Sequence, residues 1–345
     1  MAASAARPPA EAVAIVGPTA AGKTALSVAV ARRLDAEVIS MDSRQVYRGM
    51  DVGTAKASAE QRAAVVHHSL DLVEPDARFT AGNFARLARR LVPEIRARGN
   101  VPLLVGGTGF YLRALTRPLF TEPPLDRDRR RLLGDWLGAL DDATLRRWLA
   151  SLDPPTALRL SRSGGRQRLL RALELPLLTG RPLSWYHARP TTERPLPLLV
   201  FVLVPERAAL RAAIDARVDD MAAAGLVDEV RSLVRQGYRA GDPGMSATGY
   251  AELLPFLAGE TTLEEAFEQV RANTWRYARR QLTWFRHQLP ADAVRLDAAR
   301  PNGDLAEEIA EAWHINSRVP VLSRPNAKPA QNRADPGARG GPSEA

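Results

Sequence analysis

The feature that most constrains how this chain can fold is a glycine-rich turn between a strand pattern and a helix pattern. Residues 12–16 are the apolar run Ala-Val-Ala-Ile-Val, and residues 17–24 follow as Gly-Pro-Thr-Ala-Ala-Gly-Lys-Thr. The turn fits the pattern G-x-x-x-x-G-K-[ST], and helical spacing continues from Gly22 to Leu34. In such a turn, successive backbone N–H groups converge on phosphate oxygens at the positive end of the helix. The sequence therefore predicts a loop that binds a phosphate compound, without showing which one.

Strand and helix patterns alternate beyond this loop. Strands are predicted at 37–41, 101–105 and 196–204, with weaker candidates at 69–73 and 293–296, and helices at 83–98, 207–236 and 263–288. Strands that alternate with helices form βαβ units and a parallel sheet. We therefore predict an α/β fold whose parallel sheet core resembles that of P-loop NTPases.

The alternation stops in the middle of the chain. From residue 126 to about residue 180 the pattern is helical only, with breaks at 153–155 and 164–165. This interruption predicts a helical insertion domain within the sheet core. The resulting division is a core of residues 12–118 and 196–316, an insertion of residues 119–195, and disordered ends at 1–11 and 317–345, where Ala, Pro, Gly and Arg predominate.

Composition excludes several classes of protein. The 345 residues include no cysteine, which excludes disulfides and thiolate metal sites. No apolar run approaches the ~20 residues that a membrane span needs, and the first residues do not form a secretory signal. His67 and His68 lack ligand partners at metal-binding spacing. We expect a cytoplasmic monomer with no membrane partner.

The net charge of +9 favours an anionic partner such as nucleic acid, although all but three of the 48 basic residues are arginine, which a GC-rich genome also explains. The insertion concentrates arginines around Gly164-Gly165 and near its start, at positions 159, 162, 166, 168, 171, 127 and 129–131. These arginines either grip RNA phosphates or form a solvated basic face. Helix 263–288 carries a second candidate strip, at Arg276, Arg280, Thr283 and His287.

Two charged residues are candidates for chemistry. Asp42 follows the strand 37–41, at the sheet edge where α/β folds bind ligands. It could act as a general base, as a Mg²⁺ ligand, or only as the cap of a turn. Arg217 lies on the apolar side of helix 207–236, where a charge needs an anionic partner. That partner is either a bound pyrophosphate or a structural acid.

Longer segments resemble the tRNA dimethylallyltransferase (tRNA isopentenyltransferase) family of bacterial type. Residues 17–24 match the family's donor loop, and residues 41–56, Met-Asp-Ser-Arg-Gln-Val-Tyr-Arg-Gly-Met-Asp-Val-Gly-Thr-Ala-Lys, are close to its most distinctive stretch. Further matches follow in order at 104–112, 167–174, 248–250 and 280–284, so the similarity covers roughly residues 12 to 300. The chain departs from many relatives at Ala21, and it lacks the C-terminal zinc module of some eukaryotic relatives.

The resemblance implies a reaction. A dimethylallyl group would pass from dimethylallyl diphosphate to N6 of the adenine on the 3′ side of the anticodon, position 37, in tRNAs that read codons beginning with U. The products would be N6-isopentenyladenosine and pyrophosphate. Mg²⁺ would be the cofactor, and the insertion would grip the anticodon stem-loop.

The resemblance also implies roles for individual residues. Asp42 would be the base that takes a proton from N6, with Lys23, Arg217 and Thr108 as further catalytic residues. The donor pyrophosphate would bind at Gly17, Pro18, Thr19, Ala20, Ala21, Gly22, Lys23 and Thr24, with the metal near Thr24. Contacts to tRNA would come from Asp42, Ser43, Arg44, Gln45, Thr108, Arg130, Gln167, Arg168, Leu169, Leu170, Arg171, Ser246, Ala247, Thr248, Gly249, Tyr250, Ala251 and Arg280.

Two other functions fit part of the pattern. A P-loop small-molecule kinase would share the loop, the core and an aspartate at a strand end, but residues 41–56 fit it poorly. A non-enzymatic RNA-binding module would give no role to Lys23, Thr24 and Asp42.

Overall fold

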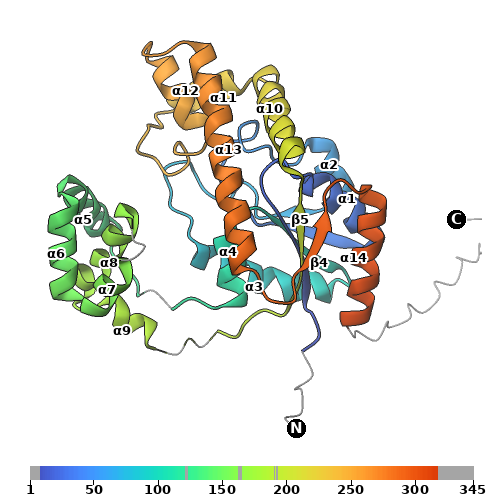
Figure 1. Cartoon of the computed structure of the whole chain (residues 1–345), viewed down its shortest axis with the longest axis horizontal. Helices are drawn as coiled ribbons and strands as arrows, with labels where there is room; N and C mark the ends of the chain where they lie inside the picture. Colours follow the sequence, from blue (N-terminus) through green and yellow to red (C-terminus); the bar gives the residue numbers. More distant parts are fainter. Residues whose placement is uncertain (1–7, 121–122, 162–164, 190, 192, 318–345) are drawn as a thin grey trace, which may run out of the picture.

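The computed structural model describes residues 8–120, 123–161, 165–189, 191 and 193–317. Most of the two ends predicted to be disordered, 1–7 and 318–345, lies outside these residues, as do Arg162 and Gly164. The described part of the N-terminal end already packs on the core, because the Ala10 N–H donates to the Asn316 carbonyl at 3.1 Å. Figure 1 shows a sheet with helices on both faces and a separate group of helices joined to it by two connecting segments.

The sheet has six parallel strands in the order β3-β2-β4-β1-β5-β6. Their bounds are β1 Ala12–Val16, β2 Ala36–Ser40, β3 His67–His68, β4 Val101–Gly106, β5 Leu198–Val204 and β6 Val294–Asp297. The predicted α/β fold with a parallel sheet is therefore confirmed. All strands end at the same edge of the sheet, and the loops that leave this edge build the site described below.

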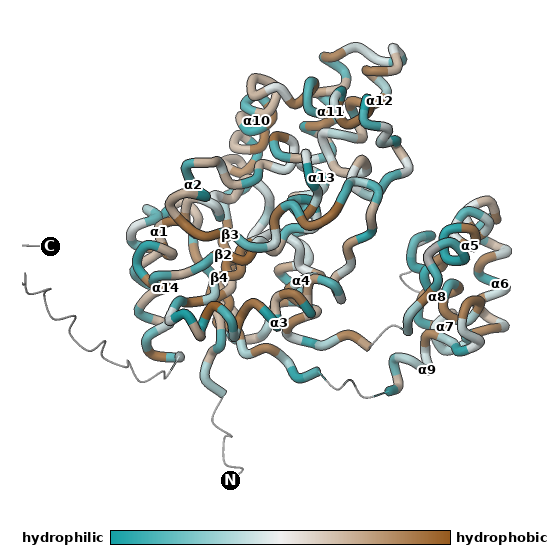
Figure 2. The backbone as a smooth tube through the Cα atoms, turned by 180° about the vertical axis from the view of Figure 1, so that it is seen from behind, coloured by the Kyte–Doolittle hydropathy of each residue, from teal (hydrophilic) through white to brown (hydrophobic). Residues whose placement is uncertain are grey.

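Helices cover both faces of the sheet. Alternate residues of β1 point to opposite sides, so that Val13 and Ile15 join one hydrophobic cluster and Ala14 and Val16 the other. The first cluster is covered by α1 Lys23–Leu34 and α14 Asn302–Asn316, and the second by α3 Ala81–Ala97, α4 Gly109–Thr116 and the end of α13 Leu263–Gln288. Figure 2 shows that hydrophobic residues concentrate in these central strands.

Two predicted elements are wrong in detail. Helix 207–236 is two helices, α10 Arg207–Ala223 and α11 Leu226–Arg235, because Gly225 adopts a left-handed conformation with φ of 89°. The strand predicted at 69–73 is absent, and β3 is the two-residue strand that precedes it. Ser69 and Asp71 have φ of 66° and 53°, values that a β-strand cannot accommodate. Four further helices were not predicted: α2 Ala59–Ala64, α4, α9 Leu183–His187 and α12 Tyr250–Leu257.

The middle of the chain forms a helical unit, which we define as residues 123–189. It contains α5 Arg127–Ala139, α6 Asp142–Leu152, α7 Pro154–Ser161, α8 Arg166–Thr179 and α9 Leu183–His187. These helices enclose a hydrophobic cluster of their own, in which Leu145, Leu149 and Leu173 are fully buried. Asp153 begins α7 by accepting the Thr156 N–H, and it accepts the Ser184 N–H ahead of α9. The helical unit therefore has an independent core and lies apart from the sheet (Figure 1).

Candidate active site

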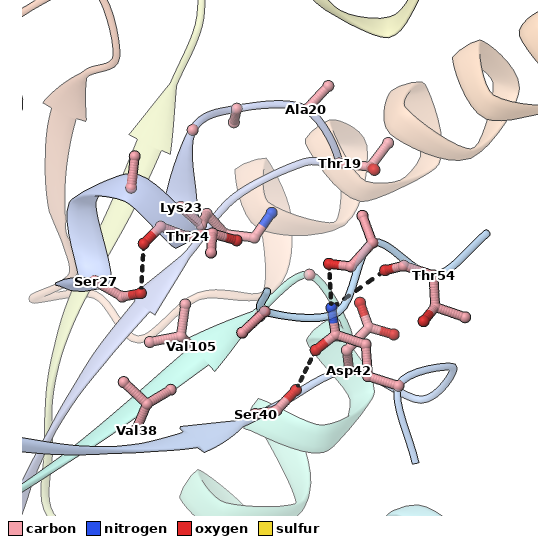
Figure 3. Close-up of a pocket in the computed structure, with 18 of the residues that line it drawn as sticks. Thr19, Ala20, Lys23, Thr24, Ser27, Val38, Ser40, Asp42, Thr54 and Val105 are labelled. Carbon is pink, nitrogen blue, oxygen red and sulfur yellow. Dashed lines mark hydrogen bonds between the residues drawn. The ribbon is translucent and has the colours of Figure 1, made fainter. Parts of the chain in front are cut away.

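A pocket of about 260 Å³ lies at the carboxyl edge of the sheet (Figure 3). The P-loop, residues 17–24, contributes Thr19 to Thr24 to its wall, and Asp42 comes from the loop after β2. Helix α10 adds Arg217, and α13 adds Tyr277 and Gln281. Four segments of the chain thus converge on one cavity. The structure brings together three of the four predicted catalytic residues, Lys23, Asp42 and Arg217, in its lining.

The P-loop is held in a curled conformation by local contacts. Ala20 and Gly22 have φ of 61° and 83°, and the Lys23 ammonium donates to the Pro18 carbonyl at 2.6 Å. Gly17 and Pro18 do not line the pocket. Gly17 packs against β5, where a Cβ would lie 3.1 Å from the Leu203 carbonyl oxygen. These first two residues therefore support the loop.

Lys23 is electrostatically prepared for an anion. Burial and, to a smaller extent, the nearby Arg217 charge lower the pKa of its ammonium group to about 8, while the Asp42 charge opposes the shift. Burial also lowers the pKa of Arg217, again against the effect of Asp42. Two cations that share a low-dielectric site favour a multiply charged anion between them. The pocket is therefore suited to a diphosphate.

Arg217 has no ion pair with any acid among the described residues. The nearest acidic influence on it is the Asp42 carboxylate, across the pocket. The alternative in which a structural acid neutralises Arg217 is therefore unsupported. Its position in the pocket wall favours a bound anion as its partner.

Asp42 is oriented by the backbone around it. Its Oδ1 accepts the Arg44 N–H at 2.8 Å, so the carboxylate caps a tight turn. The interpretation of Asp42 as a turn cap is therefore correct for this oxygen atom. The neighbouring Ser43 N–H donates to Thr108 Oγ1 at 3.0 Å. Thr108 thus lies beside the Asp42 loop, residues 41–45, and holds it to the β4–α4 turn, residues 106–109.

The β4–α4 turn approaches its neighbours so closely that only glycine fits. A Cβ on Gly106 would lie 2.1 Å from the Met41 carbonyl oxygen, and one on Gly109 would lie 2.4 Å from the Trp284 ring. Because Gly106 and Gly109 have no side chain, the backbone of this turn can lie directly against its neighbours, and the ends of β2, β4 and α13 meet around the pocket.

Two pocket residues on α13 were missed by the sequence analysis. Burial and the Asp42 charge raise the pKa of Tyr277 to about 12, so its phenol stays protonated at neutral pH. Gln281 is buried, accepts the Thr19 N–H at 2.9 Å and donates to the Gly107 carbonyl at 2.8 Å. The matching segment 280–284 contained the only signal for Gln281, and nothing in the sequence showed that this helix reaches the P-loop.

Residues 41–56 are locked by their own side chains. Gln45 accepts from Ser40 and donates to the Thr54 and Ala55 carbonyls. The Lys56 ammonium is buried and bonds to the Tyr47 carbonyl and to the carboxylates of Asp51 and Asp71. The distinctive stretch therefore serves largely to build a rigid wall for the pocket.

The pocket offers few ligands for a metal. Thr24 is exposed at its P-loop side, and Asp42 supplies a carboxylate on the opposite wall (Figure 3). Among the described residues, no group of three or more His, Asp or Glu side chains could hold a metal ion. His68 instead bonds to Glu37, and His67 to the Val65 carbonyl. One hydroxyl and one carboxylate suit a Mg²⁺ ion that is held mainly by substrate phosphates.

The comparisons with known proteins agree with this geometry. A family model described as IPP transferase matches residues 45–288, and one described as isopentenyl transferase matches residues 10–71. The chain belongs to the IPP transferase family. A member from Geobacter metallireducens, a tRNA dimethylallyltransferase, is 46% identical over 275 residues, which cover 79% of this chain and 89% of that protein.

Solved structures of IPP transferases share the fold. The full-length tRNA isopentenylpyrophosphate transferase of Bacillus halodurans is 38% identical, with a TM-score of 0.63 over 88% of this chain and 97% of that one. A eukaryotic dimethylallyltransferase, solved acting on tRNA, is 26% identical, with a TM-score of 0.75 over 91% of this chain and 81% of that one.

In this IPP transferase, two of the predicted tRNA-binding segments lie side by side. The Arg44 guanidinium donates to the Pro243 carbonyl at 2.8 Å and to Ser246 Oγ at 3.1 Å. The Asp42 loop and segment 246–251 thus form one surface next to the pocket. Arg280 is exposed on α13 beside Tyr277, with its guanidinium 5.7 Å from that ring.

Some predicted contact residues are not available to RNA. Leu169 is 1% exposed in the core of the helical unit, and Tyr250 and Ala247 are buried in the core beside the Asp42 loop. The Tyr250 hydroxyl donates to Glu229. The prediction that these three side chains contact tRNA is therefore wrong, and they belong to the hydrophobic core. A segment that matches the family contains buried residues that support a surface as well as the exposed residues on that surface.

The other candidates in the segments 167–171 and 246–251 differ in exposure. Gln167, Arg168, Ser246 and Ala251 are exposed, Leu170 and Thr248 are half-buried, and Gly249 is buried. Arg130 and Arg171 both pair with the carboxylate of Glu174 inside the helical unit. Arg168 is exposed on the same unit and is a further candidate for a phosphate contact.

Proposed function

We propose that this chain transfers a dimethylallyl group from dimethylallyl diphosphate to N6 of the adenine on the 3′ side of the tRNA anticodon. Membership of a family whose relatives are tRNA dimethylallyltransferases supports the reaction class. The observation that carries the proposal is the pocket itself, where two cations and the P-loop face a single carboxylate. A P-loop small-molecule kinase would share the loop and the aspartate at a strand end, and membership of this family argues against that alternative.

The donor half of the site stabilises a leaving group. As the bond between the allylic carbon and the diphosphate oxygen breaks, negative charge grows on the pyrophosphate. Lys23, Arg217 and the backbone N–H groups at the start of α1 lie where they stabilise this charge, and a bound Mg²⁺ near Thr24 would add a Lewis acid to the same phosphates.

The acceptor half of the site handles a proton. The exocyclic N6 amine attacks the allylic carbon, and its proton passes to the Asp42 carboxylate as the new C–N bond forms. One oxygen of Asp42 is engaged by the Arg44 N–H, which orients the carboxylate. The target base must leave its stack to reach Asp42, since that side chain is half-buried at the pocket wall.

We further propose that the protein acts as a monomer in the cytoplasm. Among the described residues, no helix is both long and apolar enough to cross a membrane. Light scattering of the purified protein, alone and with tRNA, tests the one-to-one complex.

The function is tested by incubating the protein with unmodified tRNA, dimethylallyl diphosphate and Mg²⁺. We expect a mass gain of one dimethylallyl group on the anticodon loop and release of pyrophosphate in equal amount. ATP with a panel of small acceptors serves as the control for a kinase. ATP consumption without any mass gain on tRNA would contradict the proposal.

A further inference from the structure

Gln281 links two loops that serve different substrates in the proposed reaction. Its side-chain oxygen accepts the N–H of Thr19 in the P-loop at 2.9 Å. Its side-chain nitrogen donates to the carbonyl of Gly107, in the β4–α4 turn, at 2.8 Å. The side chain is only 6% exposed, so both of its polar ends are satisfied by these two loops within the protein.

The link continues to the general-base candidate. The side-chain hydroxyl oxygen of Thr108, in the same turn, accepts the N–H of Ser43, and Ser43 directly follows Asp42. Hydrogen bonds therefore run from the P-loop through Gln281 and the β4–α4 turn to the Asp42 loop. The P-loop holds the donor and the Asp42 loop receives the acceptor, so this chain of contacts sets the separation of the two reactants.

The geometry at Gln281 tolerates little change. A Cβ on Gly107 would lie 2.2 Å from the Gln281 side-chain nitrogen, so a side chain there would displace the Gln281 amide. The position needs an acceptor toward Thr19 and a donor toward Gly107, and glutamine supplies both at neutral pH without having to take up a proton. The Thr19 N–H is occupied by this contact and is therefore not part of the phosphate cradle.

Helix α13 presents Gln281 within a continuous face. Tyr277 lies one turn earlier and borders the pocket, and Trp284 lies one turn later against Gly109. The helix runs over 26 residues, from Leu263 to Gln288, so this face is carried by a long and regular element. Tyr277 and Gln281 line the pocket, and Trp284 packs against the β4–α4 turn beside it.

We propose that Gln281 is a positioning residue that fixes the distance between the bound donor and Asp42. The proposal rests on the proposed function for the identity of the two substrates. A misplacement of about 1 Å between reacting groups costs roughly 100-fold in rate. Loss of either hydrogen bond of Gln281 therefore lowers kcat. The affinity for tRNA changes little, because segment 246–251 and the exposed arginines of the proposed tRNA surface do not contact Gln281.

The first test replaces the amide by its isostere in Gln281→Glu. At pH 8 the introduced carboxylate still accepts from Thr19 but repels the Gly107 carbonyl, and we expect kcat to fall about 100-fold with tRNA affinity within threefold of the original. Burial raises the pKa of such a carboxyl above its usual value of about 4.3. As the pH falls to 5.5, the protonated form regains a donor, so the activity of the variant relative to the unaltered enzyme at the same pH rises.

Gln269→Glu, on an exposed position of the same helix, is the matched control and should change none of these quantities. The proposal is overturned if Gln281→Glu keeps its kcat at pH 8, if its relative activity does not rise at low pH, or if tRNA affinity falls in parallel with kcat.

The second test does not depend on the reaction. Hydrogen exchange of the P-loop amides is compared between the unaltered protein and Gln281→Leu, which removes both hydrogen bonds. We expect the Thr19 amide to exchange at least tenfold faster, with amides in the centre of β1 unchanged. Unchanged exchange at Thr19 would overturn the link, whereas an inactive unaltered enzyme with accelerated exchange in the variant would overturn only the proposed function.

Discussion

At the scale of single residues, the pocket separates its charges into two roles. Lys23 and Arg217 lie on the donor side, where burial lowers the pKa of each in the absence of an anion. Asp42 lies on the opposite wall with one oxygen already engaged by backbone. A carboxylate placed this way influences both cations without forming an ion pair with either, so it stays available for a proton.

Replacing Asp42 by asparagine tests its role as the base. Asp42→Asn keeps an oxygen that can accept the Arg44 N–H, so the turn is preserved while the proton acceptor is lost. We expect the single-turnover rate of transfer to fall by a factor on the order of 1,000, since general-base catalysis typically contributes 10²–10⁴. Filter binding should show tRNA affinity unchanged. Loss of binding, with normal transfer in the complexes that still form, would make Asp42 a contact residue only.

The lowered pKa of Lys23 predicts a pH dependence of donor binding. With the pKa at about 8, part of the ammonium is neutral above that pH, and a bound pyrophosphate raises the pKa again. Pyrophosphate binding should therefore take up a proton near pH 8.5, and its affinity should fall as the pH rises above 8 and stay flat just below it. Calorimetry in buffers of different ionisation enthalpy measures this uptake.

The control for this prediction is Lys23→Arg, which keeps a charge that does not titrate in this range. Its binding of pyrophosphate should lose the part of the pH dependence that the Lys23 ammonium causes, and what remains reports the ionisation of pyrophosphate itself. Proton uptake that persists in the arginine variant would assign the effect to another group.

At the scale of elements, the pocket depends on close contacts between loops at the sheet edge. Glu229, on α11, accepts the backbone N–H groups of residues 51, 52 and 53 and the Tyr250 hydroxyl. A single carboxylate thus ties residues 41–56 to both α11 and α12. Gly53 makes this possible, because a Cβ there would lie 2.5 Å from the Tyr250 ring.

The β4–α4 turn gives a direct test of this close packing. In Gly106→Ala, the new methyl group would lie 2.1 Å from the Met41 carbonyl oxygen, and backbone rather than a flexible side chain must move. We expect the free energy of unfolding to fall by about 1–3 kcal/mol, measured by urea denaturation, together with a loss of transfer activity.

Gly134→Ala is the matched control for Gly106→Ala. Gly134 lies within α5, where a Cβ would meet no atom within 4 Å. The same substitution should be neutral or stabilise the protein by up to about 1 kcal/mol. Equal destabilisation by both substitutions would contradict the packing argument.

At the scale of the whole molecule, the chain consists of a sheet core that holds the pocket and a helical unit that holds none of it. Figure 1 shows the helical unit on one side of α13, facing the core across the two connecting segments. Exposed arginines occur on both, at Arg168 in the helical unit and at Arg280 on α13. This arrangement fits an RNA stem held between two bodies.

Salt dependence tests whether both bodies contact the tRNA in one complex. Each phosphate contact releases counterions, so removing one contact lowers the slope of log K against log salt by about 0.9. We expect Arg168→Ala and Arg280→Ala each to lower the slope by about this amount, and the double variant by about twice as much. Arg90→Ala, at an exposed position on α3, is the control. Slopes that do not change in the double variant would place the tRNA elsewhere.

The sequence alone was sufficient for features that depend on neighbouring residues. The P-loop follows from one strand, one turn and one helix, whose hydrogen bonds join residues a few positions apart, such as Lys23 and Pro18. The position of Asp42 follows in the same way, because a parallel strand carries the next residue to the carboxyl edge of the sheet. The fold class, and Lys23 and Asp42 as candidates for the site, were therefore predictable from local patterns.

Only the tertiary structure decided which distant residues complete the site. Gln281 lies 262 positions from Thr19, and Glu229 lies 178 positions from Asp51, so no periodicity or spacing could pair them. Tertiary packing also removed Leu169 and Tyr250 from the surface and divided helix 207–236 at Gly225. The physical reason is that hydrogen bonds and burial depend on distance in space, and the folded sheet brings together loops that the chain keeps far apart.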